Sequence, residues 1–589
     1  PSSQEDRPAL LLLRKLWNLL APFRPDYGWY IAGIVVRQAL LVLGGYSLVW
    51  VLRTCTRYSS IPVWTFVAAL LLFDTGLLRL DLVLNTRYCK RIGYPLFGYL
   101  RSRALSKMFE MPLEWHIQRD SGVVAGHVNN GVGKVVQTAE SVSRELVPAI
   151  IRTGLSLVPL LWFSPVTAPF LLVGLAVFLW QTRRENLARQ PFRESRYENY
   201  ARDYGLFSEC MEYVQPVVHF GQTARILQTY GRVQDQIVRE GTEETEVGNR
   251  YAWRRNLLLS LTKRICQGIW IWQFKANIFD MGLVMYLNML TEELLNSFWS
   301  YAALIERVYD GMEPTRVLLK MLEETPLIRE AEGARPVQVP DSIGIEIEEL
   351  CFSYECGEQV LNKFNLSIEP GSVVGVTGRS GIGKTTLQHL LSRLLDAQDG
   401  RILISGEDVR RWPLEQLRGL FSTVSQSGGV FFSNSTIVET ICFARPDASL
   451  GEVIASAKAA CIHDDIIRMP HGYETKIGRG GVTLSKGQQQ RMALAQALLA
   501  LDRNRRIVIL DEFTSALDAE TEERVLRNIL PLLKGKTVIL IAHRLATVRK
   551  LADKIVVIDR KGVIEAGSHA ELVHKGGWYS EMARLQATA

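Results

Sequence analysis

The chain has 589 residues, of which 47% are hydrophobic and 22% charged, and 68 basic against 61 acidic side chains give a formal net charge of +7. This composition excludes a disordered, collagen-like or coiled-coil fibrous protein. Eight cysteines without a regular CxxC spacing also exclude a disulfide scaffold and a structural zinc module. The two halves of the chain differ, because the first holds long apolar runs and the second has the pattern of a soluble α/β domain.

Four apolar runs in the first half are long enough, as helices, to cross a hydrocarbon core of about 30 Å. They cover residues 27–52, 62–84, 146–163 and 166–180. Ser164 and Pro165 separate the last two runs and predict a tight turn between them. The alternative is a set of buried core helices in a large soluble protein, and the succession of four such runs favours membrane spans.

Two further spans are predicted at residues 257–288 and from residue 294 toward residue 318, where charged side chains interrupt the apolar pattern. An ionisable group in the middle of a membrane costs about 2.5 to 3.5 kcal/mol on insertion scales, so these charges predict a water-filled or protein-lined cavity. For Lys263, Arg264 and Asp310, helix ends that project into the cytosol are an equal alternative. We expect the side chains that line a cargo cavity to include Arg37, Asp74, Lys275, Asp280, Glu306 and Arg307.

The polar segments between the spans predict the orientation of the chain in the membrane. Residues 85–145 and 181–256 are rich in Arg and Lys, which is typical of cytoplasmic loops. The connections on the other side are short. We therefore expect a multi-pass protein of a bacterial-type inner (plasma) membrane, with six transmembrane helices and with the N-terminus and the C-terminal domain in the cytoplasm.

A polar linker with Pro326, Pro336 and Pro340 follows the last predicted span. After it, short β-like runs alternate with helical runs, which indicates a parallel α/β sheet. The predicted organisation is therefore a helical membrane domain with cytoplasmic coupling loops over residues 1–324, a linker over 325–344 and an α/β domain over 345–589.

The residues from Gly378 to Thr385 fit the phosphate-binding pattern G-x-x-x-x-G-K-[ST]. A strand-like run, SVVGVT, precedes the motif, and a helical run, TLQHLLSRLL, follows it, as the motif requires. Backbone N–H groups of such a loop surround a β-phosphate, the Lys neutralises phosphate oxygens and the Thr binds Mg²⁺. The predicted cradle consists of Gly378, Ser380, Gly381, Gly383, Lys384, Thr385 and Thr386.

Two later strand-like runs end in polar residues at the edge where an open α/β sheet binds its ligand. The run RIVIL ends in Asp511 and Glu512, and the run TVILIA ends in His543. Asp511 is placed to hold Mg²⁺ through water, Glu512 to polarise an attacking water and His543 to reach a γ-phosphate. Each ending is a weak signal by itself, but the order of all three along the chain is a strong one.

The segment Leu484-Ser485-Lys486-Gly487-Gln488 resembles LSGGQ, the signature of ABC ATPases. The rest of that family's pattern follows in order, with Tyr354 in CFSY, Gln426 in STVSQ, a D-loop that ends at Asp518, and His543. With six predicted spans ahead of this domain, the whole chain resembles an ABC half-transporter of the exporter (type IV) architecture. That resemblance is specific in the ATPase half and architectural in the membrane half.

The resemblance implies ATP and Mg²⁺ as cofactors and a role for each matched residue. Tyr354 would stack on adenine, Thr385, Gln426 and Asp511 would hold Mg²⁺, and Glu512, His543 and Gln426 would form the catalytic group. Ser485, Gly487, Gln488 and Asp518 would complete the nucleotide site of a second half-transporter, so the family pattern implies an obligatory homodimer or heterodimer. Segments around residues 118–123 and 209–221 resemble the two coupling helices that dock near Gln426.

Four residues depart from the family pattern. Lys486 replaces a Gly of the signature, Lys476 and Arg479 stand where acidic residues are usual, and Gln496 stands where Arg is common. Because Lys384, Asp511, Glu512, Gln426 and His543 are intact, we expect a competent ATPase. The departures leave open a heterodimer whose two sites differ.

The leading function is therefore an ATP-hydrolysing transporter that moves a polar or amphipathic cargo across the membrane by alternating access. The alternatives are an importer of a metal chelate of the siderophore type, built on the exporter fold, and an ATP-gated channel or regulator. The expected partners are the lipid bilayer, a second half-transporter and the cargo. We expect no nucleic-acid partner, because basic cytoplasmic loops account for the net charge of +7.

Overall fold

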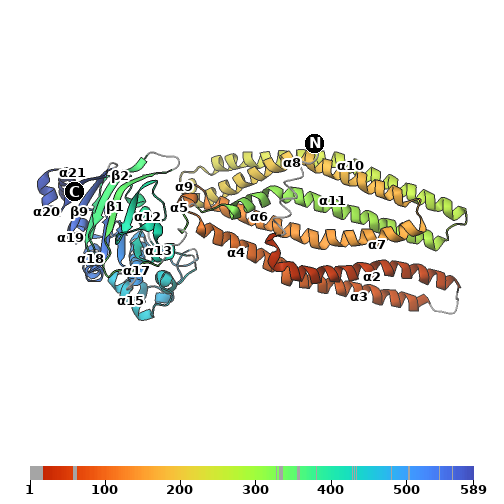
Figure 1. The fold of residues 1–589 in the computed structure, drawn as a ribbon, viewed down its shortest axis with the longest axis horizontal. Coiled ribbons are helices and arrows are strands. Elements are labelled where there is room, and N and C mark those ends of the chain that lie inside the picture. Colours follow the sequence, from red (N-terminus) through yellow and green to blue (C-terminus); the bar gives the residue numbers. More distant parts are fainter. Residues whose placement is uncertain are drawn as a thin grey trace. The chain divides into compact units, whose positions relative to one another are not determined.

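The computed structural model describes residues 18–57, 63–326, 328–330, 336–354, 359–379, 381–426, 429, 431–432, 434–478, 480–501, 505–542, 544–559 and 562–588 (Figure 1). The chain folds into two compact units. The helical unit extends to Thr325, and the α/β unit begins at Pro326, with the short segment Pro112–Trp115 grouped with the second unit.

The helical unit is built from long helices that lie lengthwise beside one another (Figure 1). Two π-helical turns, η2 (Cys89–Gly93) and η3 (Val142–Leu146), join consecutive helices without a break in the chain direction. The other elements are η1 (Ala21–Phe23), α2 (Arg24–Arg57), α3 (Val63–Tyr88), α4 (Tyr94–Glu110), α6 (Ser121–Ser141), α7 (Val147–Phe163), α8 (Ala168–Glu212), α9 (Val214–His219), α10 (Thr223–Lys275) and α11 (Met281–Glu323). The short helix α5 (Leu113–Ile117) lies between α4 and α6 in the chain.

Two apolar clusters form the interior of the helical unit. In one, Leu96 and Leu100 of α4 pack with Val132 of α6 and Leu318 of α11. In the other, which includes Trp270, helices α7, α8, α10 and α11 share a core. The indole Nε1 of the buried Trp270 donates to Ser164 Oγ over 3.2 Å, so the turn after α7 is tied to the C-terminal part of α10.

The predicted spans at residues 27–52, 62–84 and 146–163 correspond to α2, α3 and η3 followed by α7, except that residue 62 lies outside the described residues. The span predicted at residues 166–180 lies in α8 apart from its first two residues, and the one predicted from residue 294 lies in α11. The prediction of one span over residues 257–288 is wrong, because α10 ends at Lys275 and α11 begins at Met281. Apolar residues such as Ile278 and Phe279 occupy this turn, so the hydropathy pattern continues through it.

Among the described residues, one helical stretch has both the length and the apolar composition for crossing a membrane by a hydropathy criterion. It covers Ser121–Phe163 and has a mean hydropathy of 1.7 over its most apolar window. The number of spans therefore stays a prediction.

The α/β unit contains a six-stranded sheet and a four-stranded sheet. The strand order of the first is β10-β9-β3-β8-β7-β6, in which neighbours from β9 to β6 are parallel and β10 is an antiparallel edge. Its strands are β3 (Val373–Thr377), β6 (Phe421–Val424), β7 (Ile507–Asp511), β8 (Thr537–Ile541), β9 (Lys554–Asp559) and β10 (Gly562–Gly567). Every residue of β7 and β8 is buried, as expected for parallel strands covered on both faces.

The four-stranded sheet is antiparallel and has the order β2-β1-β4-β5. Its strands are β1 (Ile345–Ser353), β2 (Gln359–Ile368), β4 (Asp399–Ile404) and β5 (Glu407–Asp408). The helices of the unit include α12 (Lys384–Leu391), α13 (Leu414–Gly419), α14 (Ile437–Ile441), α15 (Leu450–Ala459), α16 (His463–Ile467), α17 (Lys486–Ala500), α18 (Ala519–Leu533), α19 (Leu545–Leu551), α20 (His569–Lys575) and α21 (Trp578–Thr588). A helical domain followed by an α/β domain is the fold class that the sequence predicts.

Candidate nucleotide site and charged network

The predicted phosphate loop connects β3 to α12. Strand β3 lies between β8 and β9, so the loop emerges at the centre of the sheet, at the carboxyl ends of its parallel strands. Gly381 and Gly383 have φ angles of +76° and +100°, a backbone region that favours glycine. A Cβ at Gly383 would lie only 2.6 Å from Val360 Cγ1, so this position also lacks room for a side chain. Ser380 lies outside the described residues.

Lys384 is held inside this loop. Its side chain is buried, and its Nζ donates to the carbonyl oxygens of Gly378 at 3.0 Å and Arg379 at 2.9 Å. Burial lowers the pKa of Lys384, while the nearby carboxylates of Asp511 and Glu512 act in the opposite direction. The ammonium is therefore enclosed by the loop, where it can exchange backbone carbonyls for phosphate oxygens.

Asp511 ends β7, two strands away from the phosphate loop in the sheet. It is 3% exposed, and its Oδ2 is a buried atom without a hydrogen-bond donor among the described residues. Burial, and next the charge of Glu512, raise the pKa of Asp511 to about 6, while Lys384 and a hydrogen bond with Thr385 act against this shift. An unmatched carboxylate oxygen beside a threonine hydroxyl fits a hard cation such as Mg²⁺.

Glu512 follows Asp511 in a strained backbone conformation, with φ of +48°. Strand β6 pairs in parallel with β7, and Gln426 follows β6 at the same edge of the sheet. The Gln426 Nε2 donates to Glu512 Oε2 over 3.1 Å. The structure therefore brings together two of the residues that the sequence assigns to catalysis. The third, His543, lies outside the described residues, after the end of β8.

Tyr354 lies against the start of α12, although the two are far apart in the chain. Its hydroxyl is 3.1 Å from Thr386 Oγ1, and the Phe352 ring meets the Tyr354 ring edge to face at 5.0 Å. The aromatic side chain that the resemblance assigns to adenine is thus tied to the phosphate loop by a direct contact.

The signature segment forms the N-terminus of α17. Ser485 is the N-cap: its Oγ accepts from Gln488 N at 3.2 Å, and Gln488 Oε1 accepts from Ser485 N at 3.0 Å. This reciprocal pair satisfies two backbone donors at the helix end. A Cβ at Gly487 would lie 3.0 Å from Ala516 O, so glycine permits a close approach of α17 to the D-loop. Asp518 caps α18 by accepting from Thr521 N at 3.0 Å.

Two residues that the sequence analysis did not single out hold the D-loop in place. Gln490 donates to Ser515 Oγ at 2.7 Å and accepts from Ala516 N at 2.9 Å. Arg544 pairs with Glu522 at 3.0 Å and also donates to Ser515 O at 3.3 Å. No local pattern distinguishes Gln490 from its neighbours in a run of three glutamines, because its role depends on a loop 25 residues away.

The departures from the family pattern have different surroundings. Lys486 and Lys476 are exposed. Gln496 is buried and donates to Thr440 O at 2.7 Å, which ties α17 to α14. A Cβ at Gly429 would lie 2.2 Å from Gln496 Oε1, so this site is closely packed. Arg479 lies outside the described residues.

The residues predicted to line a cargo cavity are spread over the helical unit. Arg37 of α2 pairs with Asp81 of α3 at 2.9 Å, and Asp74 of α3 is exposed. Lys275 and Asp280 are exposed at the two ends of the turn between α10 and α11, where Asp280 accepts from Leu283 N at 2.7 Å. They are therefore turn residues rather than residues in the middle of a span, contrary to the expectation that placed them within residues 257–288.

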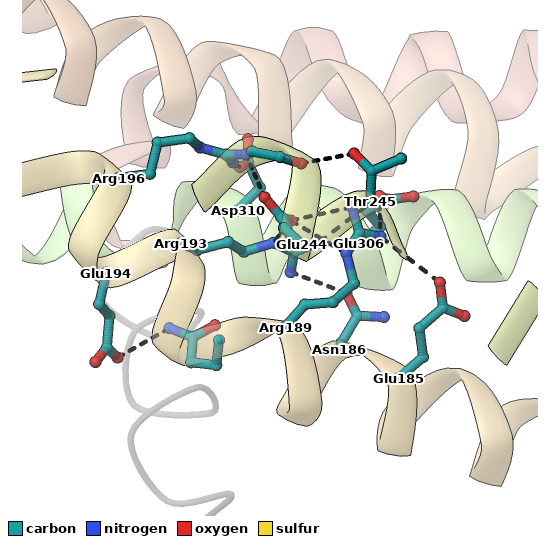
Figure 2. Close-up of polar contacts among 12 residues, drawn as sticks. Glu185, Asn186, Arg189, Arg193, Glu194, Arg196, Glu244, Thr245, Glu306 and Asp310 are labelled. Carbon is teal, nitrogen blue, oxygen red and sulfur yellow. Dashed lines mark hydrogen bonds and ion pairs between the residues drawn. The ribbon is translucent and has the colours of Figure 1, made fainter. Parts of the chain in front are cut away.

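Arg307 and Glu306, both on α11, belong to separate ionic groups. Arg307 Nη1 donates to Ser141 Oγ at 2.6 Å and pairs with Glu145. Glu306 accepts from Arg189 Nη1 at 2.7 Å, in a network that Figure 2 shows between α8, α10 and α11. Neighbouring residues on the same helix thus contact different partners.

Glu244 of α10 is the centre of this network (Figure 2). The residue is 2% exposed, and its carboxylate accepts from Arg189 Nε and Arg193 Nε, each at 3.1 Å, and from Arg196. Arg196 also forms an ion pair with Asp310 of α11 at 3.2 Å, and Asp310 pairs with Lys134 of α6 at 2.5 Å. Buried charges are stable only when paired and hydrogen-bonded, so the network constrains four helices together.

The two predicted coupling segments have different local structures. Helix α9 (Val214–His219) occupies the middle of the segment at residues 209–221. In the segment at residues 118–123 the structure has a turn and the start of α6, which Asp120 caps. The short helix in this region, α5, comes earlier in the chain, at Leu113–Ile117.

Comparison with known proteins agrees with this architecture. The family model described as ABC transporter matches residues 361–515. An uncharacterized ABC transporter ATP-binding protein of Bacillus subtilis, YknV, is 28% identical over 86% of this chain and 82% of the relative. An ATM1-type heavy metal exporter of Novosphingobium aromaticivorans is 26% identical over 85% of this chain and 81% of the relative.

The structure of a bacterial Atm1-family ABC exporter with ATP bound superposes with a TM-score of 0.86 at 23% identity, covering 96% of this chain and 98% of that one. The fold of both units is therefore that of an ABC exporter. The match to the ABC transporter model over residues 361–515 and the similarity to these relatives, together with this fold, identify the chain as an ABC half-transporter of the exporter architecture, an ATP-binding ATPase coupled to membrane transport.

Proposed function

We propose that two half-transporters assemble head to tail, with one ATP held between the phosphate loop of one chain and the signature helix of the other. The observation that carries this proposal is the group formed by Asp511, Glu512 and Gln426 at the sheet edge next to the loop that encloses Lys384. The exposed N-cap Ser485 supports the second half of the site, because the N-terminus of α17 is free to present N–H groups and a positive dipole end to a phosphate.

Within each site, we assign the following roles. Tyr354 stacks on adenine, Gly378, Ser380, Gly381, Gly383 and Thr386 shape the cradle, and Lys384 neutralises phosphate oxygens. Thr385, Gln426 and Asp511 would hold Mg²⁺, which neutralises charge on the β- and γ-phosphates when bound. Glu512 accepts a proton from the attacking water, and His543 contacts the γ-phosphate. Gly487, Gln488 and Asp518 act on the partner's nucleotide through the capped ends of α17 and α18.

We place the helical unit in an inner (plasma) membrane as a multi-pass domain, with the N-terminus and the ATPase unit in the cytoplasm. We propose a polar or amphipathic cargo moved outward by alternating access. The ionic contacts of Arg37, Glu306 and Arg307 support a polar interior in the helical unit. The heavy metal exporter among the relatives is consistent with a polar cargo.

Transport into vesicles of opposite orientation tests the direction. Inside-out vesicles with ATP added outside should accumulate cargo from a panel of metal chelates, peptides and glycolipids, and vesicles that carry Glu512→Gln should not. Accumulation of cargo only in right-side-out vesicles loaded with ATP would show that the protein is an importer and not an exporter. An ion current that depends on ATP, without accumulation of cargo, would show that the protein is an ATP-gated channel and not a transporter.

Native mass analysis of the purified protein tests the assembly. We expect a dimer that closes on ATP in the Glu512→Gln variant. A stable monomer that hydrolyses ATP at the full rate would overturn the shared nucleotide site.

A further inference from the structure

A cavity of about 390 Å³ lies between α6 and α8 of the helical unit. Gly126, Asn129 and Asn130 line it from α6, and Tyr200 and Tyr204 are among the residues that line it from α8. This volume lies in the range of small-molecule sites, which is about 300 to 1,000 Å³. None of the residues discussed for the nucleotide site or for the predicted cargo cavity belongs to it.

The cavity is outside the predicted membrane spans on both helices. Tyr197 follows the span predicted to end at residue 180 by about 25 Å along the continuous helix α8, at 1.5 Å per residue. Asn130 precedes the span predicted to begin at residue 146 by a similar length of about 24 Å. A ligand therefore reaches the cavity from water rather than from lipid.

Asp203 gives the cavity a negative charge. Among the described residues that line it, none is Lys or Arg. Asp203 Oδ1 accepts from the neutral Gln234 Nε2 at 2.6 Å and is hydrogen-bonded to Tyr230, and among the described residues it forms no ion pair. Neutral donors orient the carboxylate without cancelling its charge.

Three tyrosines form the α8 side of the cavity. Tyr197, Tyr200 and Tyr204 follow helical spacing and lie on one face of α8. Tyr200 and Tyr204 are 47% and 49% exposed, and Tyr197 OH is held by His127 Nδ1 at 2.8 Å. A Cβ at Gly126 would lie 3.2 Å from Tyr204 Cδ1, so the absent side chain lets this ring lie directly against α6.

These features select one class of ligand. An anion or a nucleotide phosphate is disfavoured, because the described lining offers a carboxylate and neither Lys nor Arg, and because burial lowers the pKa of its histidine, His127. A metal ion is disfavoured because the space is too large and because no cluster of three His, Cys, Asp or Glu occurs among the described residues. A carboxylate beside several aromatic faces instead attracts an organic cation, since the ring quadrupole and the negative charge act in the same direction.

We propose that the cavity between α6 and α8 is a binding site for a small organic cation that carries an alkylammonium or quaternary ammonium group. The ammonium contacts the Tyr200 and Tyr204 rings, Asp203 supplies the opposite charge, and Asn129 and Asn130 offer polar contacts to the rest of the molecule. The site is separate from the nucleotide site and does not depend on the proposed cargo or on dimer formation.

Calorimetric titration of the full chain, purified in detergent without nucleotide, tests this site with choline as the probe. Its uncharged carbon analogue, 3,3-dimethylbutan-1-ol, has the same shape and serves as the ligand control. We expect saturable binding of choline in the millimolar range or tighter, and binding of the analogue that is weaker by about tenfold or more. Absence of saturation up to about 10 mM choline, or equal binding of the two compounds, would overturn the proposal.

Matched variants distinguish loss of the binding site from loss of the folded structure. Asp203→Asn and Tyr204→Leu should each weaken choline binding by about fivefold to tenfold. Tyr204→Phe, which keeps the aromatic face, should restore binding, whereas a structural role of the hydroxyl would not allow this rescue. Glu198→Gln on the same helix and Tyr94→Leu on α4, both at exposed positions outside the cavity, should bind as the wild type. Unchanged binding in Asp203→Asn would also refute the assignment.

Discussion

Gln426 Nε2 donates to Glu512 Oε2 over 3.1 Å, across the carboxyl ends of two neighbouring parallel strands. The Gln426 amide donates through its nitrogen and can accept through its oxygen. This bond therefore orients the Glu512 carboxylate and does not use the Gln426 carbonyl oxygen, which can bind a cation. One contact therefore links the expected metal ligand to the expected catalytic base.

Glu512→Gln should separate ATP binding from hydrolysis. The amide keeps the size of the side chain but cannot take a proton from water, and general bases contribute about 10²-fold to 10⁴-fold to rates. We expect ATPase turnover to fall by about 100-fold or more while ATP remains bound, as measured by phosphate release and retained labelled nucleotide. The exposed Glu520→Gln on α18 is the control and should hydrolyse ATP normally.

Lys384→Ala should weaken ATP binding as well as turnover. The ammonium already lies within the loop at 3.0 Å from Gly378 O, so phosphate oxygens can replace a backbone acceptor with little rearrangement. Hydrogen bonds to charged groups contribute about 1.5 to 3 kcal/mol, which corresponds to a loss of about 10-fold to 150-fold in affinity. Equilibrium binding of a fluorescent ATP analogue measures this loss of affinity. The control is Lys550→Ala, at an exposed position, which should bind as the wild type. Wild-type affinity in Lys384→Ala would contradict the assignment of the phosphate loop.

Asp511→Asn should stabilise the protein in the absence of nucleotide and Mg²⁺, although it should abolish ATPase activity. The pKa of Asp511 is raised to about 6 by burial, against about 3.9 for an unfolded Asp. Between these values the folded state binds more protons than the unfolded state, so stability falls as the pH rises from about 4 to 6.

Asparagine does not ionise, so the variant does not lose this part of the free energy of unfolding, which amounts to roughly 2 to 3 kcal/mol above pH 6. Thermal unfolding of the α/β unit should therefore occur at a higher temperature in Asp511→Asn at pH 8, and the difference should shrink at pH 5. Glu520→Gln should show no such pH dependence. A variant that is less stable than the wild type at pH 8 would mean that Asp511 has a stabilising partner in the folded state.

Gly487→Ala should impair turnover through a steric effect. The added Cβ would lie 3.0 Å from Ala516 O, so either α17 or the D-loop must move. We expect ATPase activity to fall several-fold with ATP affinity nearly unchanged, because in the proposed shared site the displaced groups face the partner's nucleotide and not the phosphate loop of the same chain. Gly451→Ala is a helical control with open space, since its nearest neighbour would be Ser449 Oγ at 3.9 Å. Equal activity of both variants would show that the D-loop tolerates the shift.

Glu244→Gln should destabilise the helical unit. The substitution leaves the guanidinium groups of Arg189, Arg193 and Arg196 without their shared buried carboxylate (Figure 2). Removing one partner of a buried ionic group costs about 3 to 5 kcal/mol, which corresponds to a decrease in apparent Tm of about 5 to 15 °C. Glu246→Gln removes an exposed carboxylate of the same helix and should shift the Tm by less than about 2 °C. Similar shifts for both variants would show that the network contributes little.

Local sequence patterns were enough to predict the order of the two domains and most residues of the candidate nucleotide site. Residues of the phosphate loop and of the signature are adjacent in the chain, and their chemistry depends on local turns and helix starts that short patterns encode. Asp511 and Glu512 were also predictable, because they stand where a buried strand ends and the carboxyl ends of parallel strands meet at one edge. Gln426 was expected only from the family resemblance.

The pairing of charged side chains could not be predicted in this way. Glu244 and Arg193 are 51 residues apart, and Glu306 and Arg189 are 117 apart, so their contacts depend on the rotation and register of packed helices. Hydropathy averaged over a window also cannot detect a short apolar turn, which is why Lys275 and Asp280 were assigned to the middle of a span when they lie at its end. Local patterns report what a segment can form, whereas the partners of a side chain depend on how distant segments pack.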